Sequence, residues 1–84
     1  MNLTDAMNTY NSALWIIKEK NYKIALVDKE ESFDWKASKD GNECVASDPL
    51  RLLALIIISE EKGEKWNHYE KDFYDEILEE FYGE

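Results

Sequence analysis

The residues best suited to catalysis are few and lie far apart in the chain. His68 is the only histidine and Cys44 the only cysteine, and a nucleophilic pair of these types must lie within hydrogen-bond reach. Cys44 falls in an apolar strand pattern and His68 at an expected helix start, which predicts a core cysteine and a surface histidine. We therefore assign no catalytic residue and expect a protein that is not an enzyme.

The sequence predicts neither a metal site nor a cofactor site. Glu64, His68 and Asp72 follow one another at four-residue spacing, which on one continuous helix would place three metal-ligating side chains on one face. Glu64 precedes the expected start of that helix, so we assign no metal site. The three glycines are isolated in the sequence, and none belongs to a phosphate-binding motif. We expect no cofactor.

The sharpest feature of the sequence is a row of acids near its C-terminal end. On a helical wheel they fall within about 140° of one face. We define this acidic stripe as Asp72, Asp75, Glu76, Glu79 and Glu80. Its carboxylate pairs at i,i+4 spacing each destabilise a helix by roughly 0.2–0.5 kcal/mol, and the last two acids face the negative end of the helix dipole. The stripe is either a solvated face or a docking surface for a basic protein partner.

The other face of the same segment is apolar, and it predicts ordinary core packing. Its members are Phe73, Tyr74, Ile77, Leu78 and Phe81.

Trp15 is a second candidate for partner binding. In the expected N-terminal helix it points about 150° away from the centre of the apolar stripe. It shares that side with Asn8, Asn11 and Ser12, and an exposed tryptophan among small polar residues is typical of an interface anchor. The alternative is that Trp15 packs under the C-terminal helix or a chain end.

Composition limits the classes of protein to which the chain can belong. It has 84 residues, 44% of them hydrophobic and 13% aromatic, with 10 Lys and Arg against 19 Asp and Glu. This predicts one compact folded domain spanning residues 1–84. A net charge of −9 argues against nucleic acid or an anionic membrane as a direct partner. The unpaired cysteine favours the cytoplasm.

The elements that position these residues follow from local patterns. An N-terminal helix is expected from Thr4, as its N-cap, to about residue 20, followed by a strand over residues 22–27. Asp40-Gly41 is the signal for a tight hairpin between the next two strands. In that register Lys39 pairs with Asn42, and Trp35 lies opposite Ala46, which places Trp35 on a buried face.

Two further helices complete the pattern. Asp48-Pro49 is a strong helix start, and that helix runs to about Lys62 before Gly63. A last helix is expected from Asn67 to about Tyr82. The sequence therefore predicts an α+β fold in the order α-β-β-β-α-α, a three-stranded antiparallel meander covered on one face by helices. We expect the first and last helices to pack beside the second.

These patterns favour a small acidic, non-catalytic interaction protein. Its most concrete form is an inhibitor or immunity-type protein that docks a basic partner through the acidic stripe. The second helix is apolar on nearly all sides, so a homodimer and a monomer both remain open. The alternatives are a small-molecule-binding domain, a small enzyme, or a subunit of a larger complex.

Overall fold

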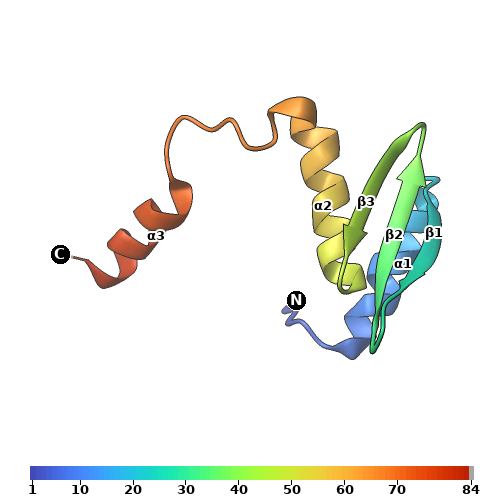
Figure 1. The fold of residues 1–84 in the computed structure, drawn as a ribbon. Coiled ribbons are helices and arrows are strands. Elements are labelled where there is room, and N and C mark those ends of the chain that lie inside the picture. Colours follow the sequence, from blue (N-terminus) through green and yellow to red (C-terminus); the bar gives the residue numbers. More distant parts are fainter. Residues whose placement is uncertain (84) are drawn as a thin grey trace.

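The structure, a computed structural model, describes residues 1–83 and has the predicted α+β fold (Figure 1). Two helices cover one face of a three-stranded antiparallel sheet with the strand order β1-β2-β3. The elements are α1 (Met7–Glu19), β1 (Lys23–Asp28), β2 (Phe33–Lys39), β3 (Asn42–Ala46), α2 (Pro49–Lys62), a short 3-10 turn η1 (Gly63–Lys65) and α3 (Phe73–Tyr82).

The β2–β3 hairpin has the predicted register. Lys39 pairs with Asn42, and Trp35 pairs with Ala46. Asp40 and Gly41 both have positive φ angles, 52° and 83°, as a two-residue type I′ turn requires. The turn therefore fixes which side chains of both strands face the helices.

Helix α2 starts and ends as predicted. The Asp48 carboxylate accepts a hydrogen bond of 2.8 Å from the backbone N–H of Arg51, and Pro49 occupies the first helical position. Gly63 ends the helix with a positive φ of 57°, a conformation that costs glycine little.

Helix α1 begins later than predicted. Thr4 lies outside the helix, and Ala6 is the N-cap. The Thr9 hydroxyl reaches back to Ala6 and accepts a hydrogen bond from its backbone N–H at 3.3 Å. The side chain that hydrogen-bonds the N-cap residue is thus inside the helix, and Thr4 does not cap it.

The hydrophobic core is small and lies where α1, α2 and β2 meet. Its fully buried members are Ile17, Ala37, Leu52 and Ile56. Trp35, Cys44 and Ala46 are partly buried and pack against this cluster. Trp35 therefore lies on the predicted face, although it is not fully buried, and its ring contacts that of Phe33 with 5.8 Å between centroids.

The position of α3 differs from the expectation. The last helix does not begin at Asn67 but at Phe73, where Asp72 is the N-cap and its carboxylate accepts from the N–H of Asp75 at 3.1 Å. Figure 1 shows a long connection that carries α3 away from α2 and the sheet. Of the two helices expected beside α2, only α1 packs there, and α3 has no buried residue.

Two tryptophans provide a matched test of this core. Trp35→Ala removes a ring that packs on the buried cluster, and we expect it to lower the free energy of unfolding by about 3 kcal/mol. Trp15→Ala removes a ring that is 66% exposed, and it should cost less than about 1 kcal/mol. Urea denaturation followed by circular dichroism measures both, and equal midpoints for the two variants would contradict this core.

Candidate partner-binding surfaces

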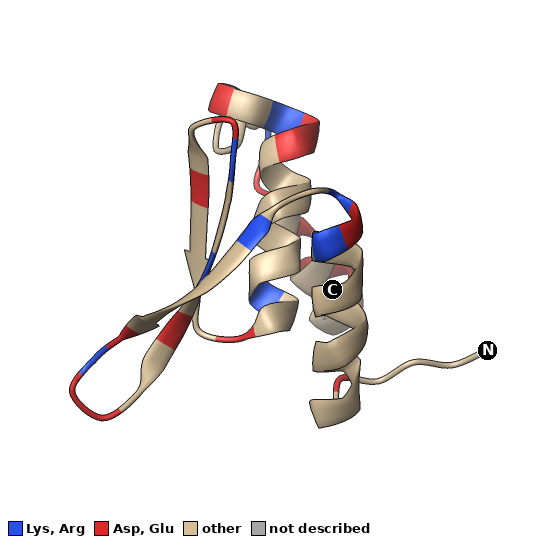
Figure 2. Ribbon diagram, turned by 90° about the vertical axis from the view of Figure 1, so that its right-hand side faces the viewer, with Lys and Arg blue, Asp and Glu red and all other residues tan. Residues whose placement is uncertain are grey.

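Trp15 lies on the open side of α1. Its side chain is 66% exposed, so it does not pack under α3 or a chain end. Figure 2 shows that α1 carries no charged residue until its last turn. A large apolar ring therefore lies on an exposed surface that is polar but uncharged, a setting suited to contact with another protein.

The acidic stripe lies on α3, and all its members are exposed. Some of these acids stabilise the helix locally, and others do not. Asp72 is the N-cap, and Asp75 and Glu76 occupy the first turn, where carboxylates interact favourably with the helix dipole. The Glu76 carboxylate also lies 3.5 Å from the Lys71 ammonium. These three acids consequently have local structural reasons to be present.

Glu79 and Glu80 are different. They lie in the last turns of α3, where the dipole disfavours negative charge, and no lysine or arginine follows Lys71 in the sequence. Glu76 and Glu80 also form a like-charge i,i+4 pair. The helix gains no local stabilisation from this pair of residues, so they are the strongest part of the docking hypothesis.

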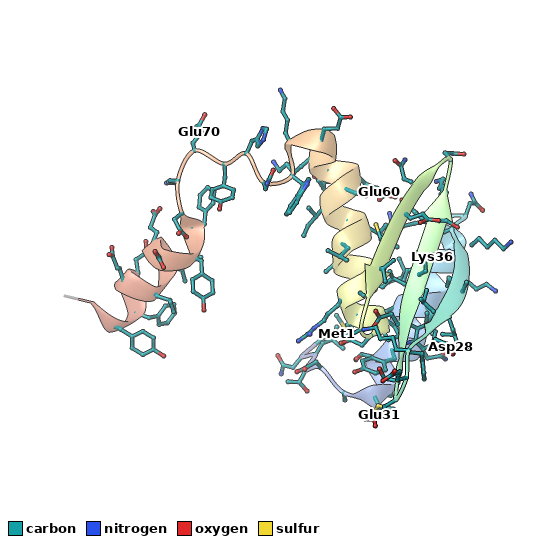
Figure 3. The ribbon with its side chains drawn as sticks, in the orientation of Figure 1. Met1, Asp28, Glu31, Lys36, Glu60 and Glu70 are labelled. Atoms are coloured by element: carbon teal, nitrogen blue, oxygen red, sulfur yellow. The ribbon has the colours of Figure 1, made fainter. Side chains whose placement is uncertain are left out.

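The exposure of the apolar face of α3 was not predicted from the sequence. It was expected in the core, yet all of its side chains are open to solvent, including Tyr74 at 74% and Phe81 at 82%. Figure 3 shows the side chains of α3 standing clear of the rest of the molecule. The amphipathic pattern correctly predicted a helix with one apolar face, but it did not indicate what that face contacts.

The two predicted parts of the partner surface do not meet. Trp15 is on α1, which packs against α2 on the sheet side, and the acidic stripe is on the projecting α3 (Figure 1). They form two separate exposed regions in this conformation.

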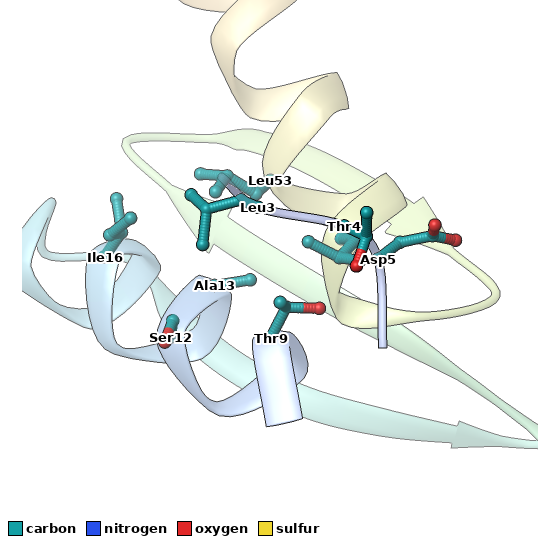
Figure 4. Close-up of a pocket in the computed structure, with 9 residues that line it drawn as sticks. Leu3, Thr4, Asp5, Thr9, Ser12, Ala13, Ile16 and Leu53 are labelled. Carbon is teal, nitrogen blue, oxygen red and sulfur yellow. The ribbon is translucent and has the colours of Figure 1, made fainter. Parts of the chain in front are cut away.

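A third surface feature is an apolar groove between α1 and α2. Its volume is about 330 Å³, and the chain segment before α1 crosses it (Figure 4). Leu3, Ile16, Leu50 and Leu53 supply most of its apolar lining, with Thr9 and Asp5 among its polar residues.

A polar cluster connects the ends of α1 and α2. The Lys20 ammonium lies 2.8 Å from one Glu60 carboxylate oxygen, and the Tyr22 hydroxyl donates to the other at 3.1 Å. The Lys39 ammonium donates to the Lys20 carbonyl oxygen at 2.8 Å and lies 5.3 Å from the centre of the Tyr22 ring. This cluster holds the α1–β1 junction against the C-terminal half of α2.

These contacts shift three pKa values. The hydrogen bond from Lys20 is the main reason that the pKa of Glu60 lies below its ordinary value. Burial, followed by the Glu60 carboxylate, raises the pKa of the Tyr22 hydroxyl. Burial raises the pKa of the Cys44 thiol, which disfavours the thiolate form that a nucleophile needs.

The candidate metal ligands do not share a helix face. His68 and Asp72 lie in the non-helical connection before α3, and Glu64 lies in η1. Within residues 1–83, no three His, Cys, Asp or Glu residues are grouped so that they could hold a metal ion.

No family model, curated protein or solved structure matches the chain. None of the helices in the described part of the chain combines the length and the apolar character needed to cross a membrane.

The lowered pKa of Glu60 leads to a pH prediction. A carboxyl whose folded pKa lies below its unfolded value stabilises the fold above the ordinary value of 4.5, and this contribution is lost as pH falls through the folded pKa. Glu60→Gln should therefore be less stable than the wild type at neutral pH, and the difference should shrink in acid, as the pH falls below 4.5 and through the folded pKa of Glu60. Urea midpoints at neutral pH and in acid measure this. Glu61→Gln is the control for general charge effects, and a difference for Glu60→Gln that persists undiminished in acid would contradict the ion pair.

Proposed function

We propose that this protein is a small non-catalytic interaction protein that binds a basic protein partner, with the acidic stripe of α3 as the docking surface. The single observation that carries the proposal is the placement of Glu79 and Glu80. They are exposed on a projecting helix, where the dipole and the neighbouring carboxylates oppose them. A role in binding accounts for acids that the helix itself disfavours.

The geometry supports an inhibitor or immunity-type mode of action. Helix α3 is connected to the core by a long segment and offers one face of carboxylates to solvent (Figures 1 and 3). Such a helix can enter a cationic groove of the kind that otherwise receives phosphate groups. Carboxylates on an exposed helix such as α3 also speed the diffusional encounter of the protein with a cationic surface of its partner. Nucleic acid is disfavoured as a direct partner, because the net charge is −9 and phosphate contacts require cations.

Trp15 provides a second contact for the same or another protein, since large aromatic side chains are the commonest anchors of binding energy. Its distance from α3 means that one partner would have to be large enough to reach both regions. We place this activity in the cytoplasm, where the free thiol of Cys44 remains reduced.

The test of the docking surface is a charge-matched pair of variants. Glu79→Gln/Glu80→Gln removes two charges from α3, and Glu30→Gln/Glu31→Gln removes two from the β1–β2 loop. In capture from native lysate followed by mass spectrometry, the wild type and the loop variant should retain a basic protein that the α3 variant loses. With the recovered partner, the association rate of the wild type should fall steeply as salt increases. Equal capture of that protein by both variants would contradict the proposal.

A second readout separates binding from folding. Glu79→Gln/Glu80→Gln removes the conflict with the dipole and should raise helix content in α3. We expect stronger helical signal at residues 73–82 by NMR chemical shifts. Loss of helix in this variant would mean that the two carboxylates stabilise α3, and the argument from their unfavourable position would fail.

A further inference from the structure

We propose that two copies of this chain form a homodimer by exchanging their C-terminal helices. The apolar face of α3 from each copy packs on the outer face of α2 of the other copy. The apolar face of α3 is exposed along its whole length. The outer face of α2 is exposed at Ala54, Ile57 and Ile58, and its edge at Leu50 and Leu53 adjoins the groove to α1.

The acceptor surface is the side of α2 that points away from the core. Leu52 and Ile56 are fully buried, and the residues on the opposite side of the helix are also apolar. We define the outer stripe as Leu50, Leu53, Ala54, Ile57 and Ile58. Its exposed centre is Ala54, Ile57 and Ile58, whereas Leu53 at its edge also packs against the core cluster. Ile57 and Ile58 are 40% and 41% exposed, and the spacing of three and four residues is that of a helix-packing seam.

The donor surface is the apolar face of α3. Phe73, Ile77 and Phe81 follow one another at four-residue spacing, with Tyr74 and Leu78 beside them. The outer stripe of α2 and this face of α3 each span nine residues, so that about 12 Å of helix separates the first residue from the last. Two apolar ridges of equal length are thus available for packing of one helix on another.

The surface area indicates how much of the molecule lacks a partner. The chain exposes 7441 Å², whereas a compact monomer of 9.9 kDa exposes about 5,200 Å². Its radius of gyration is 15.5 Å, against about 12 Å for a compact chain of this length. The excess of about 2,200 Å² per chain exceeds the roughly 1,000 Å² per subunit that a permanent homodimer needs.

The course of the chain after α2 favours a second copy over α3 of the same chain. Gly63 ends α2, and two turn hydrogen bonds, from Trp66 N–H to the Gly63 carbonyl at 3.2 Å and from His68 N–H to the Lys65 carbonyl at 2.9 Å, continue the chain beyond the helix end. The segment then carries α3 clear of its own core, on the side of α2 opposite the sheet but well separated from it (Figure 1). This is the extended shape that each subunit has when helices are exchanged across a two-fold axis.

Charge is compatible with this pairing. The acidic stripe lies on the side of α3 opposite its apolar face, so docking leaves it in solvent on both subunits. Arg51 and Lys62 border one side of the outer stripe on α2, and the Arg51 side chain is 74% exposed. The docked face of α2 thus has cations along one border, although Glu61 continues the line of the stripe beyond Ile58.

The first test is the mass in solution. Size-exclusion chromatography with light scattering, over a wide range of protein concentration, should give twice 9.9 kDa for the wild type. Ile77→Gln on α3 and Ile57→Gln on α2 should each weaken dimerisation by about tenfold or more, because each inserts a polar amide into both copies of the apolar contact. Glu31→Gln in the β1–β2 loop, outside both surfaces, should leave it unchanged. A mass of one chain at every concentration, or a dimer unaffected in folded Ile77→Gln, would overturn the proposal.

The second test distinguishes exchange between chains from folding back within one chain. In a Cys44→Ser background, a tagged Ile57→Cys chain is mixed with an untagged Ile77→Cys chain and oxidised, so that a disulfide between these positions can form only between copies. Exchange predicts a covalent heterodimer that is abundant compared with the control pair of Leu26→Cys and Ile77→Cys. With both cysteines in one chain, the product should again be a covalent dimer. An internal disulfide in a single chain would show that α3 covers its own α2, and would contradict the exchange.

Discussion

Helix α2 has more apolar surface than one three-stranded sheet and α1 cover. Its inner side supplies Leu52 and Ile56 to a core that has only a few fully buried side chains, and its outer side keeps Ile57 and Ile58 open to solvent. Burial of apolar area is the main favourable contribution to folding, and small domains depend on it most. The placement of α3 matters for this reason, because α3 carries a second exposed apolar helix face in the described chain and does not cover α2 of the same copy.

Helix α3 combines two surfaces that act independently. Its apolar face supplies the contact that completes a second copy, while Glu79 and Glu80 face solvent in either arrangement. A short isolated helix is marginal in water, so packing on α2 of a partner copy would also stabilise the helix that displays the acids. Self-association would then present two acidic surfaces in a fixed relation, which raises avidity for a partner with two cationic sites. The inhibitor-type function and the homodimer remain separate proposals, since each rests on a different face of α3.

Local sequence signals were sufficient for much of the fold and insufficient for the placement of α3. Asp40-Gly41 fixed the hairpin register because positive φ at both positions permits little else, and Asp48-Pro49 with Gly63 fixed α2 through its caps. The start of α3 was misplaced because Asn67 resembles a helix cap, whereas Asp72 is the residue that caps it. The exposure of Phe73 and Phe81 was not predictable, because amphipathic spacing specifies that a helix has an apolar face and contains no information about which surface, in which chain, covers it. For the candidate site, helical spacing alone predicted the shared face of the acidic stripe and the outward position of Trp15, but not their separation.

Hydrogen exchange of the α3 amides at increasing protein concentration tests the central claim most directly. The account predicts that amides in the helical part of residues 73–82, whose carbonyl partners lie within the helix, exchange rapidly in dilute solution and become protected as the concentration rises. Exchange of the β2–β3 amides should change far less over the same range, because the sheet is formed within one chain. Protection of α3 that is already complete in dilute solution and does not depend on concentration, or exchange that stays rapid at all concentrations, would contradict the pairing of α3 with α2 of a second copy.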